Sequence, residues 1–595
     1  MKRYKILGMM ASLGVALCTQ SCLDFDEPID DFRATDVVLE EEILKGNADS
    51  IDYVTQYTAE QVDSAKKHLS KYLGQLRGAQ FYLCGGKEGQ LPPHSYQFQN
   101  TLAFAYAQYG VVPHQDFAFA PELLSTYNVS GSWNNGANGQ YGSTRNSLTP
   151  LLNHAAVDTI PEIKAMVLLM FDHATIQVAD LYGPVPYSDF KDNKESAVLK
   201  YNDMRSIYLS VEANVDTIVK CFRAYEKRSP EYKSKIQSLK RAYDLMTQDK
   251  VNSMEGFETW IRFANSLKLR MAMHMVKIEP ELAKKWAEEA VADGVIDDSK
   301  YEIGMSPKDV VTRIHPLCGL FQWGDMRLSA SFESLMNSLQ HPYKDMLFKK
   351  NSGDLMNGNE VTMPANSKVV GIRSGVHTGK GQAYEVNQFI GFSTIDSDVF
   401  QFAPVYLFKW AEIDFLRAEG ALRGWNMGGT AKFFYERGIR NSSFYEPGSE
   451  EERGFAALLE KYMDTEQPRE YKYVDPTGSS PDIQSTTKIG VKWNEGDANE
   501  LKLEKIITQK YIALFPNCFE AWGEMRRTGY PKLFPVLNTQ DGDGSLKEGD
   551  LVRRMLFPND DEASLKAIRE TGLKALGGAD LQGTRIWWDV DKPNF

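Results

Sequence analysis

The chain has 595 residues, of which 42% are hydrophobic and 25% are charged, and its formal net charge is −13 at pH 7. The length and apolar content suffice for a large globular core, whereas the acidic charge and the lack of a basic stripe argue against a nucleic-acid partner. The six cysteines show no zinc-type spacing, and we expect those outside the N-terminal segment to be isolated buried thiols.

The N-terminal segment has the pattern of a bacterial lipoprotein signal. Basic residues precede an apolar stretch over 6–17, which is shorter than the about 20 residues that span a bilayer. The stretch ends in Thr19-Gln20-Ser21-Cys22, which resembles the lipobox that precedes a diacylated cysteine. We therefore predict a signal peptide over 1–21 and lipid attachment at Cys22, with plain secretion as the alternative.

An acidic tether of weak periodicity follows, over residues 22–57. Its first residues, Leu23-Asp24-Phe25-Asp26-Glu27, resemble the signal that displays lipoproteins of Bacteroidetes-type bacteria on the cell surface. Two acyl chains give stable anchoring without a transmembrane helix. Because no later segment is apolar enough to span a bilayer, we expect residues 58–595 to form one domain outside the membrane.

Apolar residues at helical spacing predict a mostly α-helical domain built from pairs of helices. Thr58 and Gln61 form a capping box at the start of the first pair, and Asp497 with Glu500 resembles another. Small residues where helices approach closely are typical of tetratricopeptide-like hairpins, although no strict repeat period is visible. The predicted pairs cover about 58–82, 161–226, 257–294, 404–445 and 497–528.

Long irregular stretches separate these pairs. They are rich in Gly, Asn, Pro, Ser and aromatic residues. Loops of this length are usually functional or disordered, and the aromatic content argues against disorder. We therefore expect a loop-rich ligand-binding face that the hairpins support. The stretches cover about 84–160, 296–403, 446–496 and 529–595.

The sequence offers little support for catalysis or a cofactor. No two histidines lie at helical spacing, and the nucleophile elbow and the dinucleotide fingerprint are absent. Nothing singles out a carboxylate pair for glycoside hydrolysis among the 80 acidic residues. The turn at 541–545 is rich in oxygen ligands, but Leu546 replaces the glycine that a calcium loop needs. We predict a protein that is not an enzyme and has no metal or other cofactor; calcium could bind at this turn, but we do not expect it.

Several blocks of sequence resemble the SusD/RagB family of outer-membrane lipoproteins. They occur in the family's order, and the lipobox stands in the expected place. The most specific block is the last, in which Gln509-Lys510-Tyr511 is followed by Glu520-Ala521-Trp522 and Arg526-Arg527-Thr528-Gly529-Tyr530-Pro531. The other blocks are Ala179–Tyr187, Trp260–Arg270 and Ala411–Glu419.

The resemblance implies a lipoprotein with tetratricopeptide-like hairpins that captures a glycan at the cell surface. It also implies that the lipoprotein acts as a lid over a SusC-like TonB-dependent outer-membrane transporter. Two alternatives remain open: capture of peptides or glycoprotein fragments for import, and a helical-repeat scaffold that binds another protein and no nutrient. Four large motif side chains are expected to pack inside the scaffold rather than touch ligand: Trp260, Arg270, Trp522 and Arg526.

Two loop regions have the composition of a sugar-binding site. Sugar rings present apolar C–H faces between polar edges, and they favour exposed aromatic rings flanked by amide, carboxylate and guanidinium groups. In the first region we expect Trp133 and Tyr141 to be stacking platforms, near Tyr127, with Asn134 and Asn135 as hydrogen-bonding partners. The alternative for each aromatic ring is a small buried cluster under the loops. The second region supplies Trp323, Asp325, Arg327 and Arg373.

Overall fold

The computed structural model describes residues 46–595, except 116–126, 130, 195–197, 248–254, 308–313, 352–367, 382–385, 446–448 and 560. The predicted lipidation site Cys22 and most of the tether lie outside the described residues. Within the described part of the chain, no helix combines the length and the apolar character that crossing a membrane requires.

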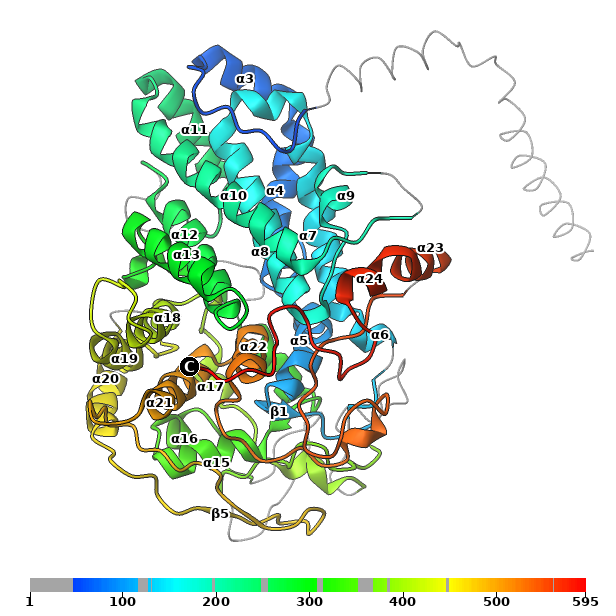
Figure 1. Cartoon of the computed structure of the whole chain (residues 1–595), viewed down its shortest axis with the longest axis vertical. Coiled ribbons are helices and arrows are strands. Elements are labelled where there is room, and N and C mark those ends of the chain that lie inside the picture. The colour runs from blue at the N-terminus through cyan, green and yellow to red at the C-terminus, as the bar shows by residue number, and fades with distance from the viewer. Residues whose placement is uncertain are drawn as a thin grey trace, which may run out of the picture.

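Long helices of the N-terminal half form a bundle at one end of the molecule (Figure 1). They are α3 (Ala59–His68), α4 (Ser70–Leu83), α7 (Gly136–Leu152), α8 (Pro161–Tyr182), α10 (Met204–Ala224) and α11 (Pro230–Tyr243). Helix α7 packs on both α4 and α8, and α10 packs on the other side of α8. Because α8 lies inside the bundle, nearly all of its residues are buried. In α10, by contrast, the buried residues form one stripe at helical spacing.

Antiparallel helix pairs continue from this bundle through the rest of the chain. They are α12 (Glu258–His274) with α13 (Pro280–Asp293), α18 (Trp410–Leu422) with α19 (Ala431–Arg440), and α21 (Asn499–Leu514) with α22 (Cys518–Thr528). Helix α12 packs on α10 and on α18, and α18 packs on α21, so the pairs stack on one another. Helix α20 (Glu450–Met463) packs against α19. This stacking is the tetratricopeptide-like arrangement that the sequence predicts.

The caps of these helices follow the sequence signals, with one exception. The Thr58 side chain accepts a hydrogen bond from the Gln61 backbone at 3.3 Å, and the Gln61 side chain accepts one from the Thr58 backbone at 2.8 Å. The capping box predicted at Asp497 is wrong, because α21 has Ala498 as its N-cap, without a side-chain hydrogen bond. The Asp497 carboxylate instead lies 2.7 Å from the ammonium group of Lys505.

Helices also occur inside the stretches predicted to be irregular. Helix α5 (Pro93–Tyr106) is buried over most of its surface and therefore has no one-sided apolar stripe to detect. Helix α7 is rich in Gly, Asn and Ser and contains Pro150, which are poor helix formers that tertiary packing overrides. The remaining helices of these stretches are α6 (Gly131–Asn134), α14 (Pro316–Gln322), α15 (Ala330–Leu339), α16 (Tyr343–Met346), α17 (Ser397–Phe400), α20, α23 (Glu562–Ala567) and α24 (Leu573–Leu576).

Strands contribute little to the described part of the fold. Three antiparallel pairs are formed: β1 (Gly110–Val111) with β3 (Arg327–Leu328), β2 (Ile303–Met305) with β4 (Val405–Phe408), and β5 (Lys472–Tyr473) with β6 (Ile483–Gln484). In the first pair Gly110 lies opposite Leu328. The remaining short elements are α9 (Tyr187–Lys191), a π-helical turn at Ile568–Gly572 and 3-10 turns at Ala155–Thr159, Tyr225–Lys227, Ser299–Tyr301, Gln388–Gly391 and Thr539–Asp541.

One hydrophobic cluster runs through the bundle and the helix pairs, and a smaller one lies beneath the loops. The smaller cluster includes Val370, Ile372, Tyr473 and Phe534. The thiols of Cys84, Cys221, Cys318 and Cys518 are free and buried, as the sequence predicts. Burial raises the pKa of the Cys84 and Cys318 thiols to about 12.

Candidate functional site

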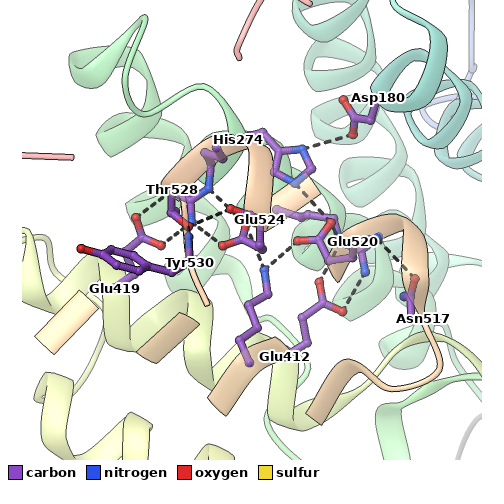
Figure 2. Close-up of polar contacts among 12 residues, drawn as sticks. Asp180, His274, Glu412, Glu419, Asn517, Glu520, Glu524, Thr528 and Tyr530 are labelled. Atoms are coloured by element: carbon purple, nitrogen blue, oxygen red, sulfur yellow. Dashed lines mark hydrogen bonds and ion pairs between the residues drawn. The ribbon is translucent and has the colours of Figure 1, made fainter. Parts of the chain in front are cut away.

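The sequence blocks that resemble the SusD/RagB family meet in a buried network of ion pairs (Figure 2). The guanidinium of Arg270 on α12 forms a two-pronged contact with the Glu412 carboxylate on α18, at 2.7 and 2.8 Å. Arg527 on α22 contacts the Glu419 carboxylate in the same way, at 2.8 and 2.6 Å. The network therefore ties three helix pairs together.

His274 extends this network toward α8. Its Nδ1 lies 3.1 Å from the Asp180 carboxylate, and its Nε2 lies 3.2 Å from the Glu520 carboxylate. Burial by itself lowers the pKa of His274, but Glu520 and Asp180 outweigh it and raise the pKa to about 9. The imidazole is therefore positively charged at neutral pH, and this charge compensates negative charge of the Asp180 and Glu520 carboxylates.

The network contains a cluster with metal-ligand chemistry, made of His274, Glu520 and Glu524. Their ligand atoms lie within 4.8 Å of one another, and all three residues are buried. However, the Lys510 ammonium lies 2.6 Å from Glu520 and 3.3 Å from Glu524. Because the protein's own cation already contacts both carboxylates, the geometry favours a structural ion-pair network over a metal centre.

The four motif side chains predicted to be structural are buried in this scaffold. The Trp260 indole donates to Asp244 at 2.9 Å, and the Trp522 indole donates to the Val552 carbonyl at 3.0 Å. The Arg526 guanidinium lies over the Trp522 ring, 3.9 Å from its centroid. With Arg270 in the ion-pair network, the prediction that these four side chains pack within the helical scaffold is confirmed.

The aromatic rings of the first predicted loop region are inside the core. Only 1% of Trp133 and 5% of Tyr141 are exposed. Trp133 stacks on Phe98 of α5, with ring centroids 5.0 Å apart and an interplanar angle of 17°. The Tyr141 hydroxyl lies 3.1 Å from the Thr175 hydroxyl. This burial corrects the expectation that the two rings are exposed stacking platforms, and it agrees with the alternative of a buried cluster.

The other residues of this region also serve the local structure. The Asn134 amide donates to the Leu556 carbonyl at 2.8 Å and accepts from the Leu556 N–H at 2.9 Å, which mimics a strand contact. Asn135 is half-buried and accepts a 3.1 Å hydrogen bond from Asn134. Tyr127 is buried at a left-handed φ of 64°, with its ring edge-on to Tyr106. These groups fix the loop and are turned away from solvent.

Trp323 is the exposed aromatic residue of the second region. It ends α14, and 45% of it is exposed. A Cβ at Gly319, one turn earlier, would lie 2.4 Å from Pro93 and 3.8 Å from the Trp323 ring. Only glycine therefore allows α14 to approach the start of α5 this closely, and this approach sets Trp323 beside the first turn of α5.

A buried polar cluster supports the loop that follows Trp323. The Asp325 carboxylate accepts from the Gln97 amide at 2.6 Å and lies 2.9 Å from Nε2 of His114. The Arg327 guanidinium donates to the carbonyls of Ile390 and Phe321 at 2.7 and 3.0 Å. Asp325 and Arg327 are both buried, so they position the loop instead of presenting charge to solvent.

The structure places Arg373 beneath the loops of the second region. Arg373 is 3% exposed, donates to the Pro535 carbonyl at 3.0 Å, and lies over the Phe534 ring. Desolvation by burial lowers the pKa of its guanidinium. Arg373 therefore packs against Phe534 of the small hydrophobic cluster, and the preceding residue, Ile372, donates to the Leu328 carbonyl of β3 at 2.8 Å.

Helix α14 packs on α5, with its last turn at the start of α5, and we name the residues at this end of the two helices the α5 face: His94, Phe98, Gln322 and Trp323. His94 and Phe98 lie one turn apart, with ring centroids at 5.0 Å, and Phe98 also carries Trp133 on its buried side. His94, Gln322 and Trp323 are exposed. The α5 face thus joins the two predicted loop regions at one helix, and it has an apolar platform edged by amide and imidazole groups.

Sequence reasoning did not identify His94 or Phe98. They lie within the stretch predicted to be irregular, although Pro92-Pro93 is a signal for a helix start. The segment that follows, His94-Ser95-Tyr96-Gln97-Phe98-Gln99-Asn100, also has the mixture of aromatic and amide groups that sugar binding favours. A search for helix starts inside the loops would have found both residues.

The oxygen-rich turn at 541–545 has its carboxylates occupied by protein groups. The Asp541 carboxylate lies 2.7 Å from Nε2 of His377, and Asp543 accepts from the backbone N–H of Ser545 and of Gln582. These contacts use the oxygens that calcium would need.

A family model described as SusD-like, the SusD and RagB outer membrane lipoproteins, matches residues 52–589. Solved structures are similar over most of the chain. A chitin-binding SusD homologue from Flavobacterium johnsoniae has 30% identity and a TM-score of 0.69, with 89% of this chain and 100% of that chain covered. A SusD-like protein from Bacteroides thetaiotaomicron has 26% identity and a TM-score of 0.71, with 88% and 99% covered.

A SusD homologue from Bacteroides ovatus has 28% identity and a TM-score of 0.68, with 88% of this chain and 100% of that chain covered. A comparison with curated proteins finds no match. The similar structures confirm the mostly α-helical fold class that the sequence predicts.

Proposed function

Because the chain belongs to the SusD and RagB family of outer-membrane lipoproteins, we propose that it is a cell-surface receptor that captures a glycan and delivers it to a SusC-like TonB-dependent transporter. Proteins of this family are binding proteins and not enzymes, in agreement with the prediction from sequence. In the proposed arrangement the receptor acts as a lid, and the ligand passes from it into the transporter.

The observation that carries the proposal is the exposure of Trp323 on the α5 face. An exposed indole offers a flat apolar surface to the C–H face of a sugar ring, and the neighbouring His94 and Gln322 can bond to its hydroxyl groups. The carboxylate of Asp325 and the amide of Gln97 hold the loop beneath. A platform that is held before ligand arrives costs less ordering entropy on binding.

Calorimetry with a glycan panel and a peptide panel tests this function. Chitin oligosaccharides come first in the panel, because a relative with 30% identity is described as chitin-binding. We expect a member of the glycan panel to bind the wild type and to bind Trp323→Ala much more weakly. Binding of peptides alone would support the peptide-capture alternative, and binding of neither panel would support the scaffold alternative.

The proposed anchoring and partnership are tested on native membranes. We expect the protein to carry a diacyl group on Cys22 and to partition into detergent, and the Cys22→Ala variant to be released from the membrane. A TonB-dependent barrel should co-purify with the lipidated protein in mild detergent. An unlipidated protein in the periplasm would contradict the proposed location of capture.

A further inference from the structure

A cavity of about 480 Å³ is lined by residues that have no part in the α5 face. Its wall is formed by the start of α19, the chain at 466–467, the loop at 488–497 and the first turns of α21. In Figure 1, α19 and α20 lie at the opposite edge of the molecule from α6. A volume of this size is far larger than a single ion needs and falls in the range of small-ligand sites, about 300–1,000 Å³.

The loop at 488–497 is held in place by backbone contacts. The N–H groups of Val491 and Lys492 both donate to the Thr465 carbonyl, at 2.7 and 2.9 Å. A Cβ at Gly490 would lie 2.1 Å from the Glu466 carbonyl oxygen, so only glycine allows the two segments to touch. The buried Lys505 ammonium donates to the Lys492 carbonyl at 2.8 Å. The cavity is therefore built before any ligand arrives.

The acidic residues of the cavity each have a lysine of their own. Glu466 lies 2.7 Å from the Lys492 ammonium, and Asp497 lies 2.7 Å from that of Lys505. Glu495 lies 3.5 Å from the ammonium group of Lys502. These pairs leave the charge of the cavity to its two remaining lysines.

Those two lysines are Lys432 and Lys488. The Lys432 ammonium forms a loose ion pair, at 3.8 Å, with Glu436, which lies outside the cavity wall. Lys488 has no carboxylate within 4.0 Å among the described residues and donates only to the Ser485 carbonyl, at 3.4 Å. In a chain with a formal net charge of −13, this cavity has a local excess of positive charge.

Besides the two lysines, Trp493 also indicates that the cavity binds a ligand. It lines the cavity, is 8% exposed, and packs against Tyr435 with ring centroids 5.1 Å apart. Its buried indole N–H has no hydrogen-bond partner in the part of the chain that the structure describes. Buried donors of this kind normally have an acceptor. Gln467 and Asn494 add amide groups to the same wall.

We propose that this cavity, which we name the Lys488 cavity, binds an oligosaccharide that carries carboxylate or sulfate groups. The anionic groups would face Lys432 and Lys488, and an oxygen of the ligand would accept from the Trp493 indole. The choice of a glycan rests on the proposed receptor function, whereas the preference for negative charge rests on the lysines alone. The site would hold an acidic oligosaccharide separate from the glycan at the α5 face.

Matched probes test the charge preference by calorimetry at low salt. The first is a tetragalacturonate, and its control is the same tetrasaccharide as the methyl ester, which keeps the sugar and removes the charge. A sulfated chondroitin tetrasaccharide distinguishes sulfate from carboxylate. We expect at least one acidic probe to bind at least ten times more tightly than the ester, and its affinity to fall as salt is added. Equal affinities for acid and ester, or no binding of either acid, would overturn the proposal.

Variants then locate the binding. The double variant Lys432→Glu with Lys488→Glu should bind the acidic probe at least tenfold more weakly than the wild type. The control is Lys66→Glu with Lys67→Glu on the exposed side of α3, and it should bind the probe as tightly as the wild type. Trp493→Phe keeps a ring and removes the N–H, and we expect a loss of about fivefold, as for one hydrogen bond. Circular dichroism and thermal melting confirm folding for each variant. Unchanged affinity in the double variant at 432 and 488 would place the anion elsewhere.

The Trp323→Ala variant separates this inference from the proposed function. This variant should lose glycan binding at the α5 face, and it should still bind the acidic probe at the Lys488 cavity. If glycans bind and depend on Trp323 but show no preference for charge, the inference fails while the proposed function stands. If the acidic probe binds at the cavity and the binding of no glycan depends on Trp323, the proposed glycan binding at the α5 face is wrong and the inference about the cavity stands.

Discussion

The buried ion-pair network and the α5 face are both rich in polar groups, yet they differ in what those groups contact. In the network, the buried guanidinium of Arg527 contacts the carboxylates of Glu419 and Glu524. Beneath the α5 face the Gln97 amide bonds to the Asp325 carboxylate, whereas His94, Gln322 and Trp323 on the face itself are exposed. One region has its charges satisfied internally, and the other keeps a surface for a partner molecule.

This difference explains why the chain is easy to assign to a family and hard to assign to a ligand. The sequence blocks that resemble the family contain Arg270, Glu412, Lys510, Glu520 and Arg527, which all belong to the network. None of the residues of the α5 face lies in these blocks. The blocks therefore specify the scaffold, and the ligand is specified by residues outside them.

The largest expected effect comes from removing a buried charge that bridges two buried carboxylates. Arg527→Leu leaves Glu419 with Arg423 alone and Glu524 with Lys510 alone, and we expect the free energy of unfolding to fall by about 3–5 kcal/mol. Urea denaturation followed by circular dichroism measures this change. The matched control is Arg440→Leu, which breaks the exposed pair with Glu460 and should cost at most about 1 kcal/mol. Equal losses in the two variants would mean that the network does not hold the scaffold together.

The charge on His274 predicts a dependence of stability on pH. Its pKa of about 9 lies above the ordinary value of 6.5, so the folded protein binds the proton more tightly than the unfolded chain. The stabilisation, about 3 kcal/mol by this shift, is fully present below pH 6.5 and is lost as the pH rises through about 9. Unfolding free energies of the wild type and His274→Gln should therefore converge at high pH.

Comparing the two proteins at each pH isolates His274 from other buried groups. Burial lowers the pKa of Lys409 to about 8, for example, and its titration affects both proteins equally. A difference between wild type and variant that stays constant from pH 6 to pH 10 would show that His274 is not charged in the folded state.

The next effect concerns glycan affinity and should come with only a small change in stability. Trp323→Ala removes the exposed platform, and we expect glycan affinity to fall 10- to 100-fold, or about 1.4–2.8 kcal/mol. The free energy of unfolding should change by less than about 1 kcal/mol, because nearly half of the residue is exposed. Phe595→Ala, at a residue that is 50% exposed, is the control that should leave affinity intact. A stability loss as large as that of Arg527→Leu would remove the contrast between the two regions.

The smallest expected effect tests the support beneath the α5 face. Asp325→Asn keeps the shape of the side chain and weakens its contacts with Gln97 and His114. We expect glycan affinity to fall about fivefold, or about 1 kcal/mol, because the loop after Trp323 is held less firmly. The double variant with Trp323→Ala should show little further loss. Additive losses would indicate that Asp325 acts on the ligand independently of Trp323.

Sequence patterns predict the scaffold better than the site for a physical reason. Helix α10 has one buried stripe and one exposed side, and this periodicity is visible in the sequence. Helix α5 is covered on most sides, so its pattern carries no period. In the same way, Trp133 and Trp323 both occur in loop-like sequence, and only the tertiary contact of Trp133 with Phe98 buries one ring and not the other.

The buried free thiols allow local opening of the ion-pair network and of the α5 face to be compared. Cys518 begins α22, which carries the network, and Cys318 lies in α14, which ends at Trp323. Both are buried, so an alkylating reagent reaches each sulfur only when its surroundings open. The alkylation rates of these two cysteines, read by mass spectrometry in a single sample, would therefore show how often α22 of the buried network opens compared with α14 of the α5 face. This comparison needs no mutation.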